Sequence, residues 1–210
     1  MQILAALCTA GMLAADNREV RPEKFWRGAT AHNTNYDWLR PPDDVLQRAI
    51  SEAYDGKTTF ERSRYRYAKR KILFGESRII TAIWLDTPLV LAVLSASTAR
   101  ERFEPKPTVA DTRRFLGKLL VSIAVETYSK DDLPYTVIRA GDRTFRPVEE
   151  SVVSEARTSC VFYAKVKCWS IGKVFLFEID KTDRLSGKGT LILRWQDLEN
   201  RLPVSFAHLW

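Results

Sequence analysis

Apolar and polar residues alternate in short runs throughout the second half of the chain, and turn-forming residues separate the runs. Alternation with a period of two is typical of β-strands that bury one face. Several short strands divided by turns predict an antiparallel sandwich or barrel rather than a parallel sheet. The expected strands cover residues 119–127, 135–139, 145–153, 161–169, 173–179, 190–195 and 202–206.

Helical patterns occur in an earlier part of the chain. The sequence Pro41-Pro42-Asp43-Asp44 opens an apolar stripe of helical period that ends at Gly56, because proline and acids are favoured in the first turn of a helix. A second helix is expected after Thr87, which serves as its N-cap. The first half of this helix, 89–94, is apolar nearly all round, so we expect it to be buried. A short third helix is expected within 108–117.

A strongly basic segment lies between the first two helices. From Arg62 to Lys71 arginines at first alternate with serine and tyrosine, a pattern that predicts a strand. Residues 72–74 continue this strand, 75–77 form a turn, and the β-branched residues of 78–85 provide the return strand. The pattern therefore predicts a basic β-hairpin.

We predict an α+β fold in which N-terminal helices and a basic β-hairpin precede a mainly antiparallel β-sandwich. The expected organisation is a signal peptide at 1–15, a helical and hairpin subdomain at 16–107, and a mainly β-sandwich subdomain at 108–210. The proline-containing stretch 104–108 marks the boundary between the subdomains. A stretch this short is a connector rather than a flexible linker.

The segment from Ile3 to Ala15 is uncharged and mostly apolar, and a polar segment follows it at once. It is shorter than the ~20 residues that a membrane-spanning helix requires, and an apolar core of this length is typical of a secretory signal. We therefore expect export to the periplasm or the cell exterior, without a transmembrane anchor. A buried N-terminal element is the alternative, because no basic residue precedes Ile3 and Leu13 occupies a place where cleavage sites prefer a small residue.

Cysteine usage leaves the cellular compartment open. Cys8 belongs to the expected signal segment, so the mature chain would keep Cys160 and Cys168. Within a single strand their Cα atoms would stand about 26 Å apart, whereas a disulfide requires a Cα separation below about 7 Å. The two cysteines can therefore pair only if the chain turns between them.

The composition, with 45% hydrophobic and 28% charged residues, is that of an ordinary folded protein. A formal net charge of +7 attracts anions such as nucleic acids, acidic glycans and anionic lipid headgroups. Charge of this kind promotes encounter with a partner but does not define a function.

The basic segment is the strongest candidate for a binding surface. On a strand its first three arginines would share one face at intervals of about 7 Å. Guanidinium groups in such a row can bind phosphates or carboxylates through two hydrogen bonds each. A Lys- and Arg-rich edge strand that prevents association between sheets is the alternative explanation. The candidate anion-binding residues are Arg62, Arg64, Arg66, Lys69, Arg70 and Lys71, with Tyr65 and Tyr67 as aromatic neighbours.

Motifs for catalysis or cofactor binding are not found in the sequence. Two histidines and three cysteines show no metal-ligand spacing, and no phosphate-binding loop, dinucleotide fingerprint or serine nucleophile elbow is present, so no cofactor or metal is expected. Adjacent acids occur at Asp43-Asp44, Asp131-Asp132 and Glu149-Glu150. A glycosidase-like hydrolase needs two carboxyl groups roughly 5–10 Å apart, and the sequence does not give that distance.

Residues 79–103 contain Trp84-Leu85-Asp86-Thr87-Pro88 and, after an alanine-rich stretch, Ala99-Arg100-Glu101-Arg102. This segment, about an eighth of the chain, resembles a segment of bacterial exported proteins of unknown function. The resemblance includes no catalytic residue and implies export.

The sequence thus favours a non-enzymatic, exported binding or interaction module that engages an anionic polymer or envelope surface. A nucleic-acid-binding protein is one alternative, and export would disfavour it. A hydrolase that acts through paired carboxylates is the other.

Overall fold

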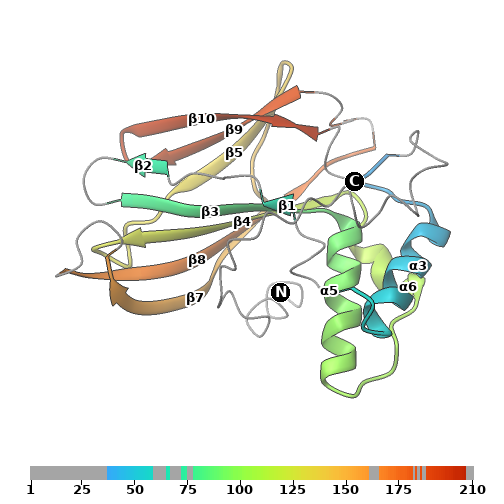
Figure 1. Cartoon of the computed structure of the whole chain (residues 1–210). Helices are drawn as coiled ribbons and strands as arrows, with labels where there is room; N and C mark the ends of the chain where they lie inside the picture. Colours follow the sequence, from blue (N-terminus) through green and yellow to red (C-terminus); the bar gives the residue numbers. More distant parts are fainter. Residues whose placement is uncertain are drawn as a thin grey trace.

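The structure is a computed structural model. It describes residues 37–58, 65–66, 72–74, 78–160, 166–181, 183, 185 and 188–206. Within this part of the chain, three α-helices accompany two antiparallel sheets (Figure 1), which confirms the predicted α+β fold. The expected signal peptide at 1–15 and most of the basic segment lie outside the described residues.

The three helices begin where the sequence predicts. They are α3 (Asp43–Tyr54), α5 (Pro88–Glu101) and α6 (Val109–Thr112). Thr87 caps α5, since its hydroxyl oxygen accepts a hydrogen bond from the backbone N–H of Val90. The helices are grouped at one end of the strands in Figure 1, where α5 packs against α3 on one side and the sheet on the other.

The strands form a six-stranded sheet A and a four-stranded sheet B. In sheet A the order is β3–β4–β8–β7, with β1 and β2 both paired to β3; in sheet B it is β10–β9–β5–β6. The strands of sheet A are β1 (Tyr65–Arg66), β2 (Ile72–Phe74), β3 (Arg78–Asp86), β4 (Lys118–Thr127), β7 (Glu149–Ser159) and β8 (Lys167–Glu178). Those of sheet B are β5 (Tyr135–Ala140), β6 (Arg143–Phe145), β9 (Lys188–Trp195) and β10 (Leu198–Ser205).

Sheet A lies between the helices and sheet B. Alternate residues of β4, such as Val121 and Ile123, belong to the core that the two sheets share, where Trp195 of β9 is also fully buried. Leu120, on the opposite face of β4, packs with Leu91 of α5. The central strand β4 is therefore buried on both faces, and the expected one-sided alternation is wrong for it.

Sheet A also joins the two expected subdomains. Strand β3 precedes the 107/108 boundary and β4 follows it, yet the two strands are antiparallel neighbours from Ile79↔Glu126 to Asp86↔Leu120. Their contact lies in the middle of the sheet rather than at an edge. The chain before and after the boundary therefore contributes to one core.

The strand expected at 161–169 is wrong. Strand β7 ends before Cys160 and β8 begins before Cys168, so the chain reverses direction between the two cysteines. They form a disulfide with their Cα atoms 5.1 Å apart. The backbone N–H of Cys160 also donates to the carbonyl of Val166 at 2.9 Å. The hairpin thus supplies the turn that pairing required.

Strand β8 is continuous where the sequence indicated a break at 170–172. The backbone N–H of Gly172 donates to the Ser154 hydroxyl at 3.1 Å, beside an irregularity in β7 between Val152 and Ser154. The extra residue of this bulge, Val153, lies in β7, whereas residues 170–172 of β8 keep their register with β4, so β8 stays paired on both sides. The strand expected at 145–153 is likewise divided, because β6 ends and β7 begins within it.

One acidic side chain ties the two sheets together. Asp132, in the connection between β4 and β5, accepts a hydrogen bond from the Arg78 Nε of sheet A at 2.7 Å. Its other oxygen accepts from the Trp195 Nε1 at 2.9 Å and from the Gln196 Nε2 at 3.2 Å, at the end of β9. Charge-assisted hydrogen bonds of this kind hold the start of β3 beside the end of β9.

Candidate functional site

The outer face of sheet B differs from its inner face in the chemistry of its side chains. Alternate residues such as Leu191, Leu193 and Trp195 point into the core. The intervening positions of the same strands point outward and carry the charges. The outward positions are Tyr135, Val137 and Arg139 on β5, Lys188, Thr190, Ile192 and Arg194 on β9, and Glu199 and Arg201 on β10.

Two adjoining hollows on this face form what we call the sheet B groove. Their volumes are about 380 and 310 Å³, and both are lined by Arg139, Ile192 and Arg201. Because the hollows share three residues, they form one depression that runs along the strands. The first is also lined by Tyr135, Val137, Thr144, Arg146 and Arg194, and the second by Gly141, Lys188, Gly189 and Thr190.

The floor of the groove is apolar and its sides are cationic. Ile192 is the register partner of Arg201 on β10 and of Val137 on β5. Arg146 follows β6, on the far side of β5. Neighbouring strands lie about 4.8 Å apart, so β10 and β6 are separated by about 14 Å, with Ile192 and Val137 between them.

Glu199 organises one side of the groove. Its Oε2 accepts a hydrogen bond from the Nε of Arg194 at 2.7 Å, and its Oε1 accepts one from the Nε of Arg201 at 2.7 Å. The hydrogen bond from Arg201, which has the larger effect, and the one from Arg194 lower the pKa of the Glu199 carboxyl from its usual value. The acid is therefore ionised at neutral pH and fixes two guanidinium groups beside the floor.

The other cations of the groove have no acidic partner within the described part of the chain. Arg139, Arg146 and Lys188 form no ion pair or hydrogen bond through their side chains there. The lining residues comprise four arginines and one lysine, with no acid among them. This arrangement favours an anionic ligand, since Glu199 beside the groove offsets only one of five positive charges.

The residues singled out from the sequence lie elsewhere. The backbone of Tyr65 and Arg66 forms β1, with Leu85 and Trp84 of β3 as register partners. Arg62, Arg64, Tyr67, Lys69, Arg70 and Lys71 lie outside the described residues. The proposed role of this segment in binding anions stays a prediction.

The paired acids occupy three separate elements. Asp43 at the start of α3 pairs with Arg113 at 2.8 Å, and Glu150 of β7 pairs with Lys173 at 3.3 Å. Asp132 is occupied by its contacts to both sheets. Each of these three carboxylates thus has its own cationic partner. Among the described residues, no cluster of three His, Cys, Asp or Glu side chains is suited to hold a metal ion.

Comparison with known proteins gives this chain no relative: no protein family, no curated protein and no solved structure matched it. The resemblance of residues 79–103 to exported proteins stays an expectation. Among the described residues, no helix combines the length and apolar character needed to cross a bilayer.

Proposed function

We propose that this protein is a non-enzymatic, exported binding module and that it binds an anionic polymer of the cell envelope in the sheet B groove. The observation that carries the proposal is the set of four arginines and one lysine around an apolar floor. Arginine forms paired hydrogen bonds to phosphates, sulfates and carboxylates, and it loses little hydration on doing so. A groove with this lining suits a ligand that carries several negative charges.

The shape of the groove supports an extended ligand. Both hollows are open depressions on one sheet face, and they adjoin along the strands rather than closing around a small molecule. Cations on both sides of the floor allow successive anionic groups of one chain to be bound together. Such multivalent contact raises affinity without requiring any single strong contact.

Two observations support export. The disulfide between Cys160 and Cys168 is of a kind that persists in oxidising compartments and is rare in the cytosol. The apolar run from Ile3 to Ala15 has the composition of a secretory signal core. In such a compartment the abundant polyanions are envelope glycans and phosphate polymers, and nucleic acid is the less accessible partner.

Retention on immobilised heparin, a sulfated glycan, tests the proposal. The variant R139S/R146S/R201S is expected to elute at much lower salt than the wild type, because three cations of the groove are lost. The matched control is K106S/R113S/R114S, which removes the same charge outside the groove and should elute close to the wild type. Equal elution of the two variants would show that net charge alone causes retention and would overturn the assignment of the groove.

A third variant, R62S/R64S/R66S, decides between the two basic regions. If it loses retention while the groove variant keeps it, the binding surface is the segment predicted from the sequence. Binding of single-stranded DNA is measured in parallel, because the exposed Tyr135 could stack a base beside the arginines. Tighter binding of this DNA than of heparin, with a steep dependence on salt, would favour the nucleic-acid alternative.

A further inference from the structure

Resting on the proposed function, we infer that the sheet B groove prefers phosphate groups over carboxylates. The preference comes from Arg194 and Arg201, which form a clamp for one phosphate, with Glu199 as the residue that positions them. The expected ligand is a phosphodiester polymer whose phosphates alternate with uncharged spacers such as polyols or sugars.

The clamp follows from which nitrogen atoms Glu199 uses. Both ion pairs are made through the Nε of the arginine, at 2.7 Å each. A guanidinium carries five N–H donors, so the four N–H groups on the two terminal nitrogens of each arginine are left for a ligand. Because one carboxylate binds both side chains, Arg194 and Arg201 are held next to each other beside the groove.

Phosphate suits two adjacent guanidinium groups better than a carboxylate does. The oxygens of a phosphate are arranged tetrahedrally, so they can accept hydrogen bonds from two guanidinium planes at once. A carboxylate can also accept from two arginines, as Glu199 does, but its lone pairs lie in one plane, so both guanidinium groups must approach within that plane. Two guanidinium groups that are not coplanar therefore form fewer directed hydrogen bonds to a carboxylate than to a phosphate.

The floor indicates what separates the phosphates. Ile192 is only 7% exposed and is the register partner of Val137, so this part of the floor offers no hydrogen-bonding side chain. An uncharged spacer can cover these residues without leaving a buried polar group unpaired. Arg139 and Arg146, across the floor from the clamp, are then available to a neighbouring phosphate of the same chain.

The positioning role of Glu199 makes a prediction opposite to that of simple electrostatics. Replacing Glu199 by Gln removes a negative charge next to the groove, and charge alone would tighten binding of any anion. Glu199 orders the long side chains of Arg194 and Arg201 before a ligand binds. Without Glu199 the ligand itself must order them, and the loss of their conformational entropy weakens binding. We expect E199Q to bind inorganic polyphosphate on the order of 10-fold more weakly than the wild type.

The test compares two probes on the full chain by isothermal titration: inorganic polyphosphate and polygalacturonate, a carboxylate polymer, with matched numbers of charges. The wild type is expected to bind polyphosphate about 10-fold more tightly than polygalacturonate. R194K/R201K keeps the charges but removes two planar forks, so polyphosphate binding should weaken more than polygalacturonate binding and the preference should shrink. E155Q, which removes the same charge from the exposed Glu155 of β7, is the control and should match the wild type.

The outcomes separate this inference from the proposed function. Failure of the wild type to bind either probe would overturn the proposed function itself. Equal affinities of the wild type for the two probes would leave the proposed function standing and overturn the preference for phosphate. Unchanged or tighter binding of polyphosphate by E199Q would show that Glu199 does not position the clamp.

Discussion

Sheets A and B are both antiparallel, but they use their two faces differently. The central strands β4 and β8 of sheet A are mostly buried, and near α5 they pack against this helix on one face and face sheet B on the other. Strands β5 and β9 of sheet B bury only one face and present arginines on the other. A polar side chain in a strand that is buried on both faces needs a buried partner, as Ser122 of β4 has in Asp86, whereas sheet B can change its outer residues without disturbing the core.

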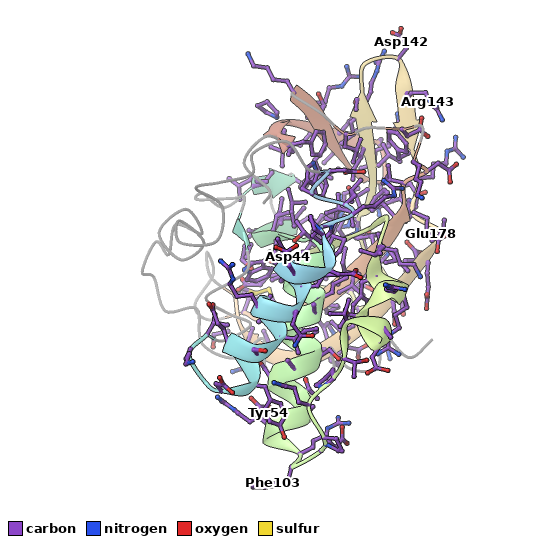
Figure 2. The ribbon with its side chains drawn as sticks, turned by 90° about the vertical axis from the view of Figure 1, so that its right-hand side faces the viewer. Asp44, Tyr54, Phe103, Asp142, Arg143 and Glu178 are labelled. Atoms are coloured by element: carbon purple, nitrogen blue, oxygen red, sulfur yellow. A yellow bond between two sulfur atoms is a disulfide. The ribbon has the colours of Figure 1, made fainter. Side chains whose placement is uncertain are left out.

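The figures show how far the helices lie from the hairpin of sheet B. Figure 2 places Asp142 and Arg143, in the hairpin between β5 and β6 of sheet B, far from Phe103 at the end of α5. The helices thus accompany sheet A and leave the outer face of sheet B uncovered by any helix among the described residues. We therefore expect substitutions in sheet A to reduce stability and substitutions on the outer face of sheet B to reduce binding.

The largest expected effect is in sheet A. Leu120 is fully buried against α5, so Leu120→Ala should lower the free energy of unfolding by about 2–5 kcal/mol. Val137 also points away from the core between the sheets, but its face of sheet B carries no helix in the described part of the chain. Val137→Ala should therefore cost below about 1 kcal/mol. Urea unfolding measures both variants, and equal losses would show that the outer face of sheet B is also covered.

The disulfide of sheet A gives an intermediate effect. Replacing Cys160 and Cys168 together by serine releases the hairpin between β7 and β8 and should lower stability by about 2–3 kcal/mol, the value for a short closed loop. The hairpin between β9 and β10 has no cross-link among the described residues, so reduction should leave the groove able to bind heparin. Loss of heparin binding by the double variant while the protein remains folded would show that the hairpin between β7 and β8 supports the groove.

The smallest effect concerns pH and sheet B. The pKa of Glu199 is lowered from 4.5 by Arg201 and Arg194, so its stabilising contribution is complete above pH 4.5 and is lost as the pH falls through the lower folded-state pKa. The difference in stability between the wild type and E199Q should therefore be constant at neutral pH and shrink on acidification. Chemical denaturation from pH 7 to pH 2 measures it, and a difference that grows in acid would refute the ion-pair geometry.

Local signals in the sequence were sufficient to predict the helices and several strands. Thr87 followed by proline predicts the start of α5, because capping and backbone geometry depend on adjacent residues. The sequence does not indicate the continuity of β8 through Gly172, because it depends on pairing with β4 on one side and β7 on the other. Pairing between strands can override a local turn signal, and the sequence alone does not show which strands will pair with each other.

The groove was missed for a related reason. Period-two alternation places Arg139 and Arg194 on one face of their own strands, which the sequence could have indicated. It does not show that β5 and β9 are neighbours, with Tyr135 opposite Arg194, since these residues are far apart in the chain. The segment from Arg62 to Lys71 is recognisable from the sequence because its charges are contiguous. A surface assembled from separate strands becomes visible only when their pairing is known.

The contacts of Asp132 affect how fast a ligand can bind in the groove. Because this carboxylate binds Arg78 of one sheet and Trp195 and Gln196 at the end of β9, the strand that carries Arg194 is anchored before any ligand arrives. No backbone rearrangement then has to precede capture, so the association rate should be set by diffusion and by long-range attraction. Added salt should therefore slow association of an anionic ligand, because it shortens the distance over which the positive potential of the groove attracts the ligand.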